Sequence, residues 1–74
     1  MRKRSITLKG HRTSISLEDE FWDALDAFAA ADERSLPKLI YEIDRERMKQ
    51  SPPPGLASAL RLYVLRRVRS DVAT

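Results

Sequence analysis

One short stretch of the chain, residues 12–17, alternates between polar and less polar positions, and no other segment does so as cleanly. The less polar positions are Thr13, Ile15 and Leu17, and the polar ones between them are Arg12, Ser14 and Ser16. This alternation predicts a β-strand with one buried face and one solvated face. A lone strand needs a partner for its backbone groups. That partner is either the weaker segment 5–8 of the same chain or the same strand of a second copy, and we favour the second copy.

The rest of the chain has helical periodicity in three segments. The first helix is expected to begin at Glu18 or Asp19, and the second to follow Ser35, a good N-cap, and run to about Lys49. The third should span residues 56–69, after a stiff proline-rich connector at residues 51–55. The expected apolar faces comprise Phe21, Trp22, Leu25, Phe28 and Ala29 in the first helix and Leu36, Leu39, Ile40 and Ile43 in the second. The sequence therefore predicts a mainly α fold with one β-strand per chain.

Composition narrows the ways in which so small a chain can be stable. The 74 residues include no cysteine and one histidine, His11, which excludes disulfides and leaves no basis for a metal site. At this length a single core is marginal, so a partner subunit is the stabilising device that we expect. No apolar run approaches the roughly 20 residues that span a membrane, and no secretory signal precedes the first strand, so we expect a cytoplasmic protein.

No group of residues forms a recognisable catalytic site. A serine–histidine arrangement would depend on His11 alone, and the two glycines, Gly10 and Gly55, form no phosphate-binding loop. We therefore expect neither an enzyme nor a cofactor, and no small-molecule substrate is evident.

Charge is unevenly distributed along the chain, whose formal net charge is +3. Residues 1–12 carry five cations and no acid, whereas residues 18–33 carry acids and no base. Residues 1–4 are expected to be disordered, and Gly10 to mark a turn or bulge before the main strand. A basic arm beside a strand could meet an anionic polymer, although a solvated tail is the alternative.

The order of strand, helix, serine-capped turn and helix resembles the ribbon-helix-helix family of DNA-binding proteins. The resembling stretches are Arg12-Thr-Ser-Ile-Ser-Leu-Glu-Asp-Glu-Phe-Trp-Asp-Ala-Leu and Ser35-Leu-Pro-Lys-Leu-Ile-Tyr-Glu-Ile. The chain is also similar to a bacterial subfamily with an "RSITL" start, an "RTS-(I/V)-S-L-E" strand and an "LASALR" third helix, here beginning at Arg4, Arg12 and Leu56.

The resemblance implies an intertwined homodimer whose two-stranded antiparallel ribbon enters the major groove of double-stranded DNA as a transcriptional regulator, for instance a repressor. It places Arg12, Ser14 and Ser16 on base edges, where arginine and serine can form hydrogen bonds. It places the start of the second helix, with Ser35, Leu36 and Lys38, on backbone phosphate, and we add Arg4 and Lys9 of the basic arm. The turn before that helix usually holds a glycine, whereas Glu33 or Arg34 stands there in this chain.

The domain organisation that we expect is a basic arm at residues 1–10, a ribbon-helix-helix core at 11–50, the connector at 51–55 and a helix within 56–74 that completes the same domain. Segment 5–8 could either extend the ribbon or cover it. The alternative function is a dimeric protein-interaction module without specific DNA binding, which would hold its partner on the acidic first helix or the broadly apolar third helix.

Overall fold

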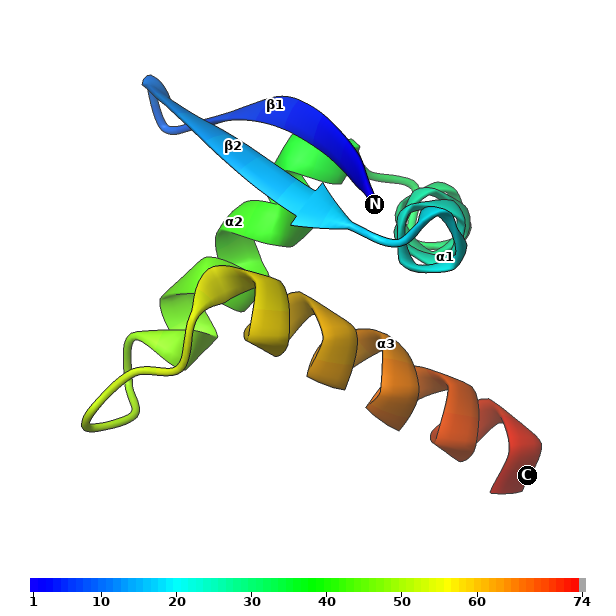
Figure 1. The fold of residues 1–74 in the computed structure, drawn as a ribbon. Helices are drawn as coiled ribbons and strands as arrows, with labels where there is room; N and C mark the ends of the chain where they lie inside the picture. The colour runs from blue at the N-terminus through cyan, green and yellow to red at the C-terminus, as the bar shows by residue number, and fades with distance from the viewer. Residues whose placement is uncertain (74) are drawn as a thin grey trace.

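A computed structural model describes residues 1–73 of the chain, which form a β-hairpin followed by three helices (Figure 1). The elements are β1 (Arg2–Leu8), β2 (His11–Leu17), α1 (Asp19–Ala31), α2 (Leu36–Arg47) and α3 (Leu56–Ala73). The hairpin lies on one side of the molecule, and α3 runs along the other with its C-terminal end pointing away from the hairpin (Figure 1). The prediction of a mainly helical fold is confirmed, but the described chain contains two strands, not one.

The main strand finds its partner within its own chain, so our preference for a second copy at this edge was wrong. β1 pairs antiparallel with β2 in a register that sets Ser5 opposite Ser14 and Leu8 opposite His11. The two-residue turn between them has positive φ angles at both Lys9 (50°) and Gly10 (83°), as a type I′ turn requires. The turn expected at Gly10 is confirmed. Residues 2–4, which we expected to be disordered, belong to β1 because Ile6 and Leu8 hold this strand on the core.

One edge of β2 remains without a neighbouring strand in the described chain. In a two-residue hairpin the pair that flanks the turn is hydrogen-bonded, and bonded and non-bonded pairs then alternate along an antiparallel ladder. Counted from Leu8 and His11, the non-bonded positions of β2 are Arg12, Ser14 and Ser16. The peptide groups of these three residues therefore point away from β1, toward the open edge.

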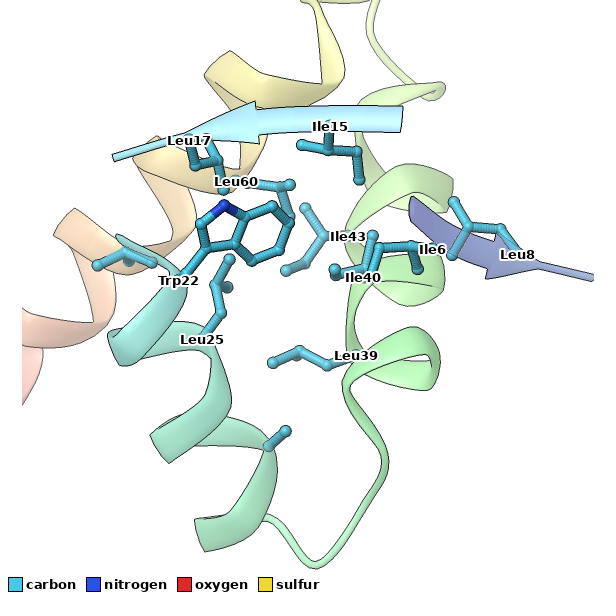
Figure 2. Close-up of a cluster of buried hydrophobic side chains, with 12 residues drawn as sticks. Ile6, Leu8, Ile15, Leu17, Trp22, Leu25, Leu39, Ile40, Ile43 and Leu60 are labelled. Atoms are coloured by element: carbon cyan, nitrogen blue, oxygen red, sulfur yellow. The ribbon is translucent and has the colours of Figure 1, made fainter. Parts of the chain in front are cut away.

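The core gathers side chains from all five elements around Trp22 (Figure 2). The indole is fully buried near Leu17, Leu25 and Leu60, and its N–H donates a hydrogen bond to the carbonyl oxygen of Arg2 at 2.8 Å. The buried set comprises Ile6, Leu8, Ile15, Leu17, Trp22, Leu25, Ala29, Leu39, Ile40, Ile43, Leu60 and Val64. The apolar faces predicted for α1 and α2 supply most of the helical members, with Phe21, Phe28 and Leu36 packed at the margin.

The turn between α1 and α2 has the hydrogen bonds of a Schellman motif without its usual glycine. The N–H of Arg34 donates to the carbonyl of Ala29 at 3.0 Å, and that of Glu33 donates to Ala30 at 3.1 Å. Glu33, at the position that normally carries glycine, has a φ of 56°. The prediction that Ser35 caps α2 is confirmed, because its Oγ accepts from the N–H of Lys38 at 3.3 Å.

Two arginine–carboxylate pairs fasten α3 to the start and the end of α1. Arg61 donates to both carboxylate oxygens of Glu18, at 3.0 and 3.2 Å, and Arg67 does the same to Asp32, at 2.7 Å for each bond. These hydrogen bonds lower the pKa of Glu18 and of Asp32 below the ordinary carboxyl values. Such fork-shaped pairs fix geometry as well as charge. No helix within residues 1–73 is long and apolar enough to cross a membrane.

Candidate nucleic-acid interface

The outer face of the hairpin is a flat polar surface built by alternation along both strands. Its residues all lie exposed, and across the two strands they form the pairs Lys3 with Ser16, Ser5 with Ser14, and Thr7 with Arg12. Hydroxyl and guanidinium groups at these positions can donate hydrogen bonds, and the hydroxyls can also accept them. β1 lies beside β2 in the same sheet, so it extends the ribbon and leaves this face uncovered.

The predicted base-reading residues occupy the centre of this outer face. Arg12, Ser14 and Ser16 are exposed, and Arg12 has no acidic partner among the described residues. Ile15 and Leu17 alternate with them along β2 and are buried, being 4% and 0% exposed. This burial fixes the orientation of the strand. A slip of one residue would bury Arg12 and expose both apolar side chains, so the core determines which side chains face outward.

The start of α2 presents two unpaired backbone donors. The N–H groups of Ser35 and Leu36 have no acceptor among residues 1–73, Pro37 has no N–H, and the N–H of Lys38 is bound by Ser35. No acid stands in this first turn, and the Lys38 side chain is exposed. The positive end of the helix dipole adds to these donors, so the turn is suited to an anion.

The two cations assigned from the basic arm differ in placement. Arg4 lies on the inner face of β1, where its guanidinium is 4.7 Å from the centroid of the Trp22 ring and 3.2 Å from the carboxylate of Asp26. Lys9 lies exposed at the hairpin tip, with its Nζ 5.1 Å from the centroid of the Tyr41 ring. The structure therefore brings Lys9 next to α2 and sets Arg4 apart from the outer face.

Ion pairing divides the cations of the chain into two groups. Half of the 14 lysines and arginines form ion pairs with acids, and the pairs of Arg34, Arg61 and Arg67 link separate elements. Among the described residues, the cations without an acidic partner are Lys3, Lys9, Arg12, Lys38, Arg45, Arg66 and Arg69. Five of these seven belong to the hairpin or to α2. The hairpin and α2 therefore carry most of the positive charge that no acid compensates.

A search against sequence families gives one match that decides the family. The ribbon-helix-helix domain matches residues 1–68. The chain belongs to the ribbon-helix-helix family. Members of this family are typically DNA-binding regulators of transcription and generally act as dimers. Searches of curated proteins and of solved structures gave no match.

Sequence reasoning missed the part of the outer face that β1 supplies, namely Lys3, Ser5 and Thr7. A signal for it exists, because Arg4, Ile6 and Leu8 alternate with these residues, and Gly10 readily adopts the positive φ that a two-residue hairpin turn needs. The three cations at the N-terminus concealed this alternation. Tyr41 and Arg45 were also missed, since only the folded chain brings them beside the hairpin tip.

Proposed function

We propose that this ribbon-helix-helix chain is a homodimeric, sequence-specific DNA-binding protein that regulates transcription, with β2 as its reading strand. The observation that carries the proposal is that Arg12, Ser14 and Ser16 combine two properties. Their side chains lie on the exposed outer face, and their peptide groups face the open edge of β2. If this edge paired with the same edge of a second copy, a two-fold axis would pass between the two β2 strands. The outer faces of both hairpins would then form one surface around that axis.

The symmetric pairing has a definite register. If Ser14 stands opposite Ser14 of the second copy, then Arg12 stands opposite the other copy's Ser16, and the peptide groups of all three can bond across the axis. The sheet then has four strands in the order β1, β2, β2, β1. Strands lie about 4.8 Å apart, so the two β2 strands fit within a major groove that is about 12 Å wide. The β1 strands lie roughly 7 Å from the axis, near the phosphates that border the groove.

This arrangement separates base readout from backbone contact. Arg12 can bind guanine through two hydrogen bonds, and Ser14 and Ser16 can bond to several bases. Phosphate contacts fall to the free donors of Ser35 and Leu36, to Lys38, and to Lys9 at the hairpin tip. Arg4 is left out of this set because Trp22 and Asp26 hold it on the inner face.

The test of DNA reading begins with selection of bound sequences from a random duplex pool. On the selected site, Arg12→Ala and Ser14→Ala should each remove about 1–3 kcal/mol of discrimination against altered base pairs. Arg69→Ala is the matched control, because it removes an unpaired cation from α3. If no sequence is enriched, or if Arg12→Ala leaves the base preference unchanged, the reading role is refuted.

The test of the dimer uses proline, which lacks the N–H that an edge needs for pairing. Ser14→Pro removes a donor from the open edge of β2, whereas Ser5→Pro removes one from the outer edge of β1, directly opposite. We expect Ser14→Pro to shift the sedimentation equilibrium toward the protomer and Ser5→Pro to leave the dimer intact. Dimer loss with Ser5→Pro alone would instead assign the interface to β1.

A protein-interaction module is the second candidate, and one observation favours it. On α3 the side chains of Leu62, Leu65, Val68 and Val72 are 41%, 49%, 43% and 80% exposed. Apolar side chains gathered on one helix can mark an interaction site. A gel shift with random duplex at low salt separates the candidates, because an interaction module without DNA binding should give no retardation.

A further inference from the structure

A hollow of about 460 Å³ lies between the hairpin tip and the side of α2, outside β1. It is lined by Thr7 and Lys9 from the hairpin and by Pro37, Lys38, Tyr41, Glu42 and Arg45 from α2. Three of these side chains are cations, and none of the three has an acidic partner in the described chain. Like charges that converge without a counter-ion repel each other, so the hollow is most stable when an anion enters it.

Tyr41 organises the cations around this hollow. The Nζ of Lys9 lies 5.1 Å, and the Cζ of Arg45 lies 6.0 Å, from the centroid of the Tyr41 ring. Attraction to the negative face of the ring holds both groups near one place without neutralising them. The ammonium and guanidinium donors therefore remain available to a ligand.

One acid lines the hollow, and its charge is already engaged. Glu42 accepts a hydrogen bond from Nη1 of Arg34, an interaction that raises the pKa of Arg34. The larger hollow between α2 and α3 has fewer cations without an acidic partner. Of its four arginines, Arg34, Arg47 and Arg67 are bound to acids, and Arg66 alone has no acidic partner among the described residues. The hollow at Tyr41 is therefore the better suited of the two to an anion.

We propose that the hollow around Tyr41 binds a phosphodiester group of the DNA backbone, with Lys9, Lys38 and Arg45 as its cationic ligands. This inference rests on the proposed function and goes beyond it by assigning Tyr41 and Arg45. The position agrees, because Thr7 belongs to the outer face and the hollow lies on the far side of β1 from the two-fold axis. In the symmetric pairing β1 lies roughly 7 Å from the axis, so a hollow beyond β1 lies toward the phosphates that border the major groove.

The experiment compares three full-length variants by titrating the selected duplex at several salt concentrations. Loss of one phosphate contact makes the negative slope of log K against log salt shallower by about 0.9, so Arg45→Ala, which removes one contact from each protomer, should make it shallower by about 2 in a dimer. Arg69→Ala removes the same charge from α3 and should leave the slope unchanged. Tyr41→Leu keeps every charge but removes the ring, and we expect it to weaken binding about threefold or more at 0.15 M salt.

A duplex series with single neutral methylphosphonates locates the contact. The wild-type dimer should lose affinity at one flanking phosphate on each side of the site, and Arg45→Ala should show a smaller loss there, because only Lys9 and Lys38 remain as cationic ligands. Retained folding is checked by circular dichroism. If Arg45→Ala and Arg69→Ala share one slope, or if Arg45→Ala loses as much affinity as the wild-type protein at every methylphosphonate, the phosphate site is refuted while the reading role of β2 stands. If the wild-type protein binds no duplex, the proposed function itself fails.

Discussion

Replacement of Glu33 by glycine should stabilise the protein, because the turn between α1 and α2 holds a residue with a Cβ in a left-handed conformation. Glu33 has a φ of 56°, and its exposed side chain forms no ion pair or hydrogen bond in the described structure. The left-handed conformation costs a residue with a side chain about 1–2 kcal/mol. Glycine avoids that cost but loses about 0.4–1 kcal/mol through the greater freedom of the unfolded chain.

The difference is a net gain of about 0.5–1 kcal/mol for Glu33→Gly. In a domain of this size it corresponds to a rise in Tm of about 2–8 °C. The measurement is thermal unfolding followed by circular dichroism, at one protomer concentration because dimerisation would shift Tm. Glu33→Ala is the matched control, since it removes the same charge but keeps the Cβ. We expect it to leave Tm nearly unchanged. An equal rise in both variants would attribute the effect to charge, and a fall with glycine would refute the conformational argument.

Three further predictions concern stability. Leu60→Ala should cost about 2–5 kcal/mol in urea unfolding because this side chain is fully buried. Leu65→Ala, at a position 49% exposed, should cost less than about 0.5 kcal/mol, and a cost similar to that of Leu60→Ala would show that a partner covers α3. The hydrogen bonds with Arg67 lower the pKa of Asp32. The ionised Asp32 therefore stabilises the fold fully at pH values above 3.8, the ordinary pKa, and this stabilisation disappears as the pH falls through the lowered pKa. Asp32→Asn should therefore lose less stability than the wild-type protein on acidification below about pH 4. Asp23→Asn, which removes an unpaired carboxylate, is the matched control.

Helices were predictable from this sequence because their signals are local. Ser35 and Pro37 mark the start of α2, and the spacing of Trp22, Leu25 and Ala29 marks the buried face of α1. Each signal lies within a turn or two of the structure that it specifies. The resemblance to the ribbon-helix-helix family could be recognised for the same reason, because the strand and the helix cap of this family follow each other in a fixed order along the chain.

The hairpin was harder to predict because its signal is divided between apolar alternation and charge. Ile6 and Leu8 indicate a strand, but Arg2, Lys3 and Arg4 suggested a solvated arm. Two of these residues in fact form ion pairs with α1, Arg2 with Asp19 and Arg4 with Asp26. Such pairs join residues 17 and 22 positions apart, so no local pattern reveals them.

The register of the hairpin decides whether Arg4 and Arg12 face the core or the solvent. A two-residue turn pairs Thr7 with Arg12 and Arg4 with Ile15, so Arg4 faces the core side and Arg12 faces outward. The sequence shows two similar residues in a basic N-terminal region. The buried positions of β2 turn Arg12 outward, and the two-residue turn then sets Arg4 on the inner face. β2 is fixed independently, because Ile15 and Leu17 are buried and the strand leads directly into α1, whereas β1 is oriented through its pairing with β2. The outward orientation of Arg12, Ser14 and Ser16 therefore depends on the core, and the orientation of the β1 side chains depends on the turn at Lys9 and Gly10.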